Sequence, residues 1–218
     1  MDQSIEDIKS RWSDLTSWMV TDVRDKWWNT IVTHYTESHR HYHNLEHLSQ
    51  MFRMYDSHKD SLKNRVAVAF AIIFHDIIYD PTSSENEQKS VRLFSDFAKD
   101  TTLDQAGLIS DLISASQTHC TDAHMSKDAV GSDDIHYFLD FDMAILGASS
   151  DEYSKYKESI RKEYSYLDEQ KYKQERAKVL RLFLQIPNIF ATQAFRDQYE
   201  TSARQNIQAE IDELAVSK

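Results

Sequence analysis

Histidine side chains are concentrated in one short stretch of this 218-residue chain. Histidine is the side chain that proteins most often use to bind metals and to move protons near neutral pH. His43 and His47 flank Asn44, which is a good N-cap residue, so a helix that begins there would let both imidazoles face one cavity. One could bind a metal and the other could transfer a proton, although a lone histidine is more often a surface or hydrogen-bonded core residue. The stretch holds five of the chain's 10 histidines: His34, His39, His41, His43 and His47.

An adjacent His-Asp pair, His75 and Asp76, ends an otherwise apolar segment. Burying an unpaired carboxylate beside an imidazole costs several kcal/mol, on the order of the desolvation penalties of ions, so a cation should lie against it. A divalent metal would satisfy both side chains. The alternative is a helix C-terminus that reaches solvent, with Asp76 simply exposed.

The order of these acidic and histidine residues along the chain is His47, the pair His75 and Asp76, and much later Asp142 in the segment FLDFDMAILG. This order resembles the HD-domain superfamily of metal-dependent phosphohydrolases, whose pattern is a His, a His-Asp dyad and a distant Asp on an all-helical scaffold. The resemblance implies that these four residues bind the metal, with Asp140 as a weaker candidate for the last position.

The string from Tyr42 to His47, YHNLEH, also looks like the YHNxxH motif of cyclic nucleotide phosphodiesterases. In that motif the first histidine protonates the leaving oxygen, which implies that His43 is the general acid. Seven ordered segments between Arg40 and Ile207 resemble a family of predicted bacterial HD phosphohydrolases of about this length, and this resemblance implies a reaction class more than a substrate. The segments are RHYHNLEH, AIIFHDIIYD, ENE, ISASQTH, FLDFDMAILG, IRKEY and ARQNI.

The implied ligands, two imidazoles and two carboxylates, suit a divalent ion such as Mn, Mg, Co, Ni, Fe or Zn. Such an ion lowers the pKa of a bound water and polarises a phosphoryl oxygen. Hydroxide would then attack phosphorus while His43 protonates the departing oxygen, and Asp76 could bridge to a second ion. The expected function is hydrolysis of a phosphate ester or anhydride of a small molecule, with nucleotides among the expected substrates.

Two other functions fit the same residues. An HD-type di-iron oxygenase would need more ligands, which His119 and one neighbour could provide. A non-catalytic module that binds or senses a nucleotide would keep the pocket without turnover. One Mn, Mg or Co ion per chain would favour hydrolysis, whereas two irons with dioxygen uptake would favour the oxygenase.

Further polar residues could take part in catalysis. Glu85 and Glu87, in the ENE segment, could orient the attacking water, although acidic residues at a helix N-terminus are a sufficient explanation. His119 ends a predicted helix and could be a second-metal ligand, a phosphate contact or an ordinary helix-terminal histidine, and we favour a phosphate contact or a role just outside the metal ligands. His124 and His136 lie in or beside a polar stretch and are expected to be solvated.

Local cations are needed if an acidic protein is to bind a phosphate. Arg40, beside the histidine cluster, and Arg161, in IRKEY, are the candidates to bind substrate, because a guanidinium can hold two phosphate oxygens. Arg204 is a further candidate, although surface ion pairing explains Arg161 and Arg204 about as well. A set of tyrosines could stack a base, but their helical spacing is more typical of a core. The set is Tyr153, Tyr156, Tyr164, Tyr166 and Tyr172.

The elements that must position these residues are expected to be helices, because 3 Gly and 2 Pro leave long uninterrupted stretches. We expect an all-α fold, an HD-domain helical bundle with additional C-terminal helices, as a single domain over 1–218 with a core at about 40–147. Residues 120–134 are expected to form a mobile surface loop. Periodicity and caps predict helices at about 5–18, 22–35, 44–55, 61–79, from Ser83 or Ser84 to 98, then at 103–118, 134–146, 150–164, 171–184 and 195–214.

The net charge of −11 disfavours a nucleic-acid polymer or an anionic membrane surface as a partner. One small phosphorylated substrate at a metal site remains compatible with it, and a homo-oligomer stays open. The lone Cys120 excludes an intrachain disulfide and favours a reducing compartment. The acidic N-terminus and the absence of a long apolar run favour a cytoplasmic location.

Overall fold

A computed structural model describes residues 3–101 and 103–216 of the chain, apart from the side chain of Val216. Within these ranges the regular structure is helical, and β pairing is limited to one isolated bridge between Gly131 and Thr192. The predicted all-α fold is therefore confirmed. Among the described helices, none has both the length and the apolar character that crossing a membrane requires.

The chain forms two compact units, Met1–Thr118 and His119–Lys218. The boundary between them falls inside residues 40–147, where the sequence predicts the core of one HD-type domain. Assignment of the whole chain to a single domain of that type stays a prediction.

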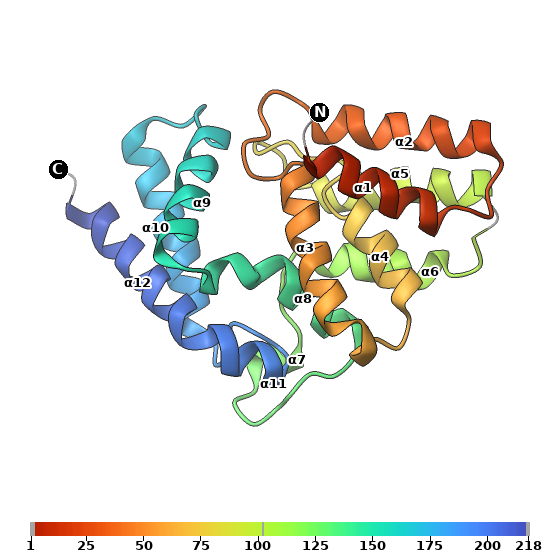
Figure 1. Cartoon of the computed structure of the whole chain (residues 1–218). Coiled ribbons are helices and arrows are strands. Elements are labelled where there is room, and N and C mark those ends of the chain that lie inside the picture. Colours follow the sequence, from red (N-terminus) through yellow and green to blue (C-terminus); the bar gives the residue numbers. More distant parts are fainter. Residues whose placement is uncertain (1–2, 102, 217–218) are drawn as a thin grey trace. The chain divides into compact units, whose positions relative to one another are not determined.

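The first unit is built around α4 (Arg65–Phe74), whose residues from Ala67 to Phe74 are all buried. Apolar side chains on every side of a helix favour such a central position. Helix α4 packs against α3, α5 and α6, and α1 packs against α2 and α3 (Figure 1). The other helices of this unit are α1 (Gln3–Leu15), α2 (Thr21–Tyr35), α3 (Leu45–His58), η1 (Lys59–Ser61), α5 (Asn86–Thr101) and α6 (Ala106–Ala115).

An aromatic cluster fills the centre of the first unit. Trp12 of α1 and Trp27 of α2 both contact Phe97 of α5, with ring centroids 5.6 and 5.4 Å apart. Phe70 and Phe74 of α4 contact the same ring at 5.4 and 5.0 Å. Tilted and edge contacts of this kind add to the free energy of apolar burial. The cluster fixes α4 and, with it, the residues that directly follow Phe74.

The second unit is organised around α12 (Thr201–Val216), which packs against α10 (Figure 1) and also against η2. A buried polar network joins α9, α10 and α12. The hydroxyl of Tyr153 donates to Glu210 at 2.6 Å, and Arg176 binds the same carboxylate at 2.8 Å. The other elements are α7 (Asp122–Met125), α8 (Asp134–Met143), η2 (Ala144–Gly147), α9 (Ser150–Glu163), α10 (Glu169–Gln185), α11 (Gln193–Phe195) and the π-helical turn η3 (Arg196–Glu200).

Several predicted helix boundaries are wrong. The helix predicted over 61–79 is shorter, because the side chain of Asn64 caps its start and it ends at Phe74. Trp18, predicted on the buried stripe of the first helix, lies beyond its end and is exposed. The predicted loop at 120–134 contains the short helix α7. Ser149, one residue before the predicted Ser150, caps α9.

Candidate metal centre

His75 lies at the C-terminal end of α4 and is 1% exposed. Its Nδ1 lies 2.9 Å from the carbonyl oxygen of Ile72, one turn earlier in the same helix. Because a carbonyl oxygen only accepts hydrogen bonds, Nδ1 carries a proton, and in the neutral ring the lone pair then lies on Nε2. The end of the helix thus fixes both the ring and its tautomer, with Nε2 able to bind a cation.

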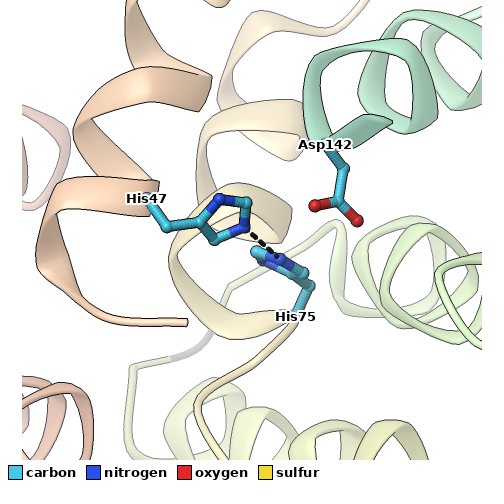
Figure 2. Close-up of side chains that lie close together, drawn as sticks. All are labelled: His47, His75 and Asp142. Atoms are coloured by element: carbon cyan, nitrogen blue, oxygen red, sulfur yellow. Dashed lines mark hydrogen bonds between the residues drawn. The ribbon is translucent and has the colours of Figure 1, made fainter. Parts of the chain in front are cut away.

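His47 faces this atom from the first turn of α3. Asn44 caps that helix by accepting from the backbone of Glu46 at 2.9 Å, as the sequence predicts, and His47 follows with 2% exposure. His47 Nε2 lies 3.4 Å from His75 Nε2 (Figure 2). Two imidazole nitrogens that bind one ion at about 2.1 Å with a tetrahedral angle between them are also about 3.4 Å apart.

Asp76 adds a carboxylate within the same unit. Its Oδ2 lies 3.2 Å from His75 Nε2, and its side chain is 15% exposed. The alternative of a simply exposed Asp76 is therefore wrong. His75 Nε2 thus has two other donors of the first unit beside it, the imidazole of His47 and the carboxylate of Asp76, and both donor types suit a divalent ion.

His43, the predicted general acid, lies immediately before the α3 cap and is half-buried. Its ring stacks on Tyr79 with centroids 4.3 Å apart and lies 5.8 Å from the ring of His47. The two histidines of the YHNLEH string are thus neighbours in space, with His47 the deeper of the two. This is the arrangement expected if His43 exchanges protons and His47 binds a cation.

Asp142, the predicted last ligand, lies near the C-terminal end of α8 in the second unit, with a side chain 11% exposed. His119 Nε2 lies 2.7 Å from its Oδ2. The backbone of His119 has a φ angle of 49°, in the left-handed region that residues other than glycine seldom adopt. The contact with Asp142 is what a residue that supports a metal ligand would make.

Asp140, the weaker candidate, is fully buried and holds the backbone that precedes α11. Its carboxylate accepts from the backbone of Ala191 at 2.7 Å, and from the backbone and hydroxyl of Thr192 at 2.9 and 2.6 Å. Burial raises the pKa of this carboxyl to about 7, against the opposing effect of these hydrogen bonds. These contacts give Asp140 a structural role.

The central residue of the ENE segment, Asn86, makes buried contacts that the sequence did not predict. Glu85 is exposed and pairs with Lys89 at 3.5 Å, and Glu87 is half-buried. Asn86 is buried, and its side-chain amide accepts from the backbone N–H of Asp80 and donates to the carbonyl of the same residue, at 3.1 and 2.9 Å. Asn86 therefore closes the loop that follows the His-Asp pair.

The three arginines expected near phosphate bind protein oxygens instead. Arg40 is buried and donates to backbone carbonyls that include that of Asp76. Arg161 donates to the carbonyls of Tyr164 and Leu167 at the end of α9. Arg204 donates to carbonyls between α10 and α11 and to Glu200. These contacts favour structural roles over phosphate binding.

His124 and His136 occupy equivalent positions in two capping boxes. The backbone N–H of Thr121 donates to Nδ1 of His124, and that of Asp133 donates to Nδ1 of His136, each at 3.0 Å. His136 is half-buried. His124 is buried, so its predicted solvation is wrong, because the sequence did not reveal that α7 would be packed into the unit.

The tyrosines of the second unit are mainly packing residues. Tyr153 and Tyr172 are buried, Tyr164 contacts Tyr172 at 6.4 Å between centroids, and Tyr166 is exposed. This agrees with the preference for a core over a base-stacking pocket.

Comparison of the chain with protein-family models, with curated proteins and with solved structures gave no match. The functional argument therefore rests on the residues and geometry described above.

Proposed function

We propose that this chain is a metal-dependent phosphohydrolase whose ion is held by His47, His75 and Asp76, with Asp142 of the second unit as the fourth ligand. The observation that carries the proposal is the pair of buried Nε2 atoms 3.4 Å apart, one of them oriented by the carbonyl of Ile72. In metal-binding histidines, the ring nitrogen that does not bind the metal commonly donates a hydrogen bond to a backbone carbonyl, which holds the ring in place.

Asp142 is proposed because it completes the chemistry of the donor set. Its carboxylate is oriented by His119 within the second unit, as carboxylate ligands commonly are by a neighbouring group. The resemblance to HD-domain enzymes supports the same assignment.

The proposed chemistry is hydrolysis of a phosphate ester or anhydride of a small molecule, with nucleotides as the first class to test. When bound, a Mn, Mg, Co, Ni, Fe or Zn ion supplies acidity to a water molecule and positive charge to a phosphoryl oxygen. His43 holds the proton that the leaving oxygen needs. Its half-buried ring, stacked on Tyr79, keeps access to a substrate while its orientation is fixed.

The first test is metal binding followed by turnover. Purified protein is stripped with a chelator, reloaded with each divalent ion in turn, analysed for metal content, and offered a panel of nucleotides and simple phosphate esters. We expect one or two ions per chain and release of phosphate. His75→Ala should abolish both tight binding and turnover, whereas Asp142→Asn should weaken binding.

His58→Ala is the matched control. The Nδ1 of His58 also contacts a helix carbonyl, that of Met54 at 2.9 Å, but His58 lies at the far end of α3 from His47. This variant should retain metal and activity. Wild-type metal content and turnover in His75→Ala would overturn the proposal, and so would two bound irons with dioxygen uptake. Stabilisation by nucleotides without turnover under any metal would indicate a binding module instead.

A further inference from the structure

The strongest unexplained feature near the proposed site is the burial of Arg40. Its side chain is fully buried within the first unit. A guanidinium that served as a phosphate ligand would need N–H groups that face a substrate. We infer that Arg40 is a positioning residue, which fixes the backbone of His43 relative to that of Asp76. The measurements of catalytic activity in its test rest on the proposed function.

The hydrogen bonds of Arg40 join two segments that are distant in sequence. Nη1 donates to the carbonyl of His43 at 3.0 Å and to the carbonyl of Asp76 at 2.7 Å. Nη2 donates to the carbonyl of Ile77 at 2.9 Å. One planar group thus binds the turn before α3 and the turn after α4, and the planar fork sets the distance between them.

A carboxylate and two aromatic rings hold the guanidinium in place. Nε donates to Glu37 Oε2 at 3.0 Å, so the buried charge has a partner. The guanidinium carbon lies 4.9 Å from the ring of Tyr35 and 5.4 Å from the ring of Tyr79. Cation–π contacts of this kind strengthen in buried surroundings.

Tyr79 extends the effect of Arg40 to the side chain of His43. The same ring that flanks the guanidinium stacks on the imidazole of His43, at 4.3 Å between centroids and 28° between planes. Arg40 therefore orients His43, the proposed general acid, in two ways. It binds the backbone carbonyl of His43, and it packs against Tyr79, whose ring stacks on the imidazole of His43. It orients Asp76, a proposed ligand, through the carbonyl of that residue.

Lysine cannot replace this arrangement. An ammonium group can reach one carbonyl or two, but it lacks the planar fork that binds three carbonyls and a carboxylate in one plane. Arg40→Lys keeps the positive charge and should leave His43 and Asp76 present but poorly oriented. A misplaced general acid matters most when the leaving oxygen needs a proton.

The test compares Arg40→Lys with the control Arg53→Lys, whose arginine forms an exposed pair with Glu46 on α3. Circular dichroism and thermal unfolding first establish that each variant folds. Affinity for Mn²⁺ is then measured by titration calorimetry, and the inhibition constant of inorganic phosphate by kinetics. Finally, kcat and KM are compared for a p-nitrophenyl phosphate ester, whose leaving group needs no proton, and an alkyl phosphate ester, whose leaving group does.

We expect Arg40→Lys to bind Mn²⁺ about 10-fold or more weakly, as changes behind metal ligands do. Its kcat should fall more on the alkyl ester than on the p-nitrophenyl ester, with KM and phosphate inhibition near the wild-type values. A raised KM with weakened phosphate inhibition and unchanged kcat would overturn the inference, because Arg40 would then contact the substrate. Unchanged Mn²⁺ affinity, or equal loss on both esters, would also overturn it.

A second variant covers the case in which Arg40→Lys does not fold. Tyr79→Leu removes the ring that supports His43 but leaves the carbonyl bonds of Arg40. It should lose rate selectively on the alkyl ester and keep its Mn²⁺ affinity, and equal loss on both esters would overturn the inference. If the wild-type chain binds Mn²⁺ but hydrolyses nothing, the proposed function fails, while the Mn²⁺ affinity of Arg40→Lys, or of Arg40→Met, still decides the inference.

Discussion

Lowering the pH should destabilise the second unit through one buried imidazole, that of His124. The ring is 1% exposed, and its Nδ1 accepts the backbone N–H of Thr121 at 3.0 Å, so the neutral tautomer is the one that the fold requires. Burial, followed by the positive charges of His136 and Arg196, lowers the pKa of His124 to about 4. The folded chain therefore keeps this side chain neutral at pH values where an exposed histidine is charged.

The sign and size of the effect follow from this difference in pKa. In the unfolded chain His124 should titrate near 6.5, so below that pH the unfolded state binds a proton that the folded state does not. The stability that His124 contributes is present above pH 6.5 and is lost as the pH falls toward 4. One pKa unit corresponds to about 1.4 kcal/mol, which gives a loss of about 3 kcal/mol in full and about 2 kcal/mol by pH 5.

The assay is urea denaturation, followed by circular dichroism at pH 7.5 and pH 5, of the wild type and of His124→Gln. Glutamine at this position can still accept from the N-cap backbone, as in the common capping box, but it does not titrate. Between the two pH values, the free energy of unfolding should therefore fall by about 2 kcal/mol less in the variant than in the wild type. Contributions from other titrating groups cancel in this comparison.

Thr121→Ala is the control, because it removes the hydroxyl of the same capping box and no titrating group. It should cost about 1 kcal/mol at both pH values. If His124→Gln and the wild type show the same pH dependence to within about 0.5 kcal/mol, His124 is not held neutral by burial and the reasoning is wrong.

Three further predictions concern packing, a buried ion pair and the metal. Phe97→Ala should lower the free energy of unfolding, measured in urea, by about 3–5 kcal/mol. The control Leu182→Ala, at an exposed position, should lower it by less than about 0.5 kcal/mol. Equal losses in the two variants would contradict the central place of the aromatic cluster. Glu210→Ala should lower the free energy of unfolding by about 3–5 kcal/mol in the same assay, because it removes the carboxylate that pairs with the buried Arg176. An unchanged free energy of unfolding would contradict the burial of this pair. A divalent ion at 100 times its Kd should raise the free energy of unfolding by about 2.7 kcal/mol, reversibly with chelator, and His75→Ala should show no such rise.

The parts of the structure that repeat a local pattern could be predicted from the sequence. Apolar periodicity identified most of the helices, and Asn44 identified the start of α3 to the residue. The run of apolar residues before His75 predicts a buried helix with polar groups at its end, and this run is the reason for proposing His75 as a ligand. These features depend on side chains three or four positions apart, and that spacing can be read directly from the chain.

The roles of Arg40 and Asn86 could not be predicted in the same way. Both side chains bind backbone groups, and backbone groups look alike at every position of a sequence. The carbonyl of Asp76 that Arg40 binds is 36 residues away, so the contact depends on how α3 and α4 pack. Charge suggested that Arg40 binds phosphate, but burial of its guanidinium points to the opposite conclusion.

Helix polarity sets the tautomer of several histidines of this chain. His75 follows a helix, where the backbone offers carbonyl oxygens, so Nδ1 donates and, in the neutral ring, Nε2 has the lone pair. His124 and His136 begin helices, where the backbone offers N–H groups, so Nδ1 accepts and Nε2 carries the proton in the neutral ring. His58 also contacts a carbonyl at a helix end, so this contact alone does not single out His75. What distinguishes His75 is that His47, from a second helix, faces its Nε2 in buried surroundings.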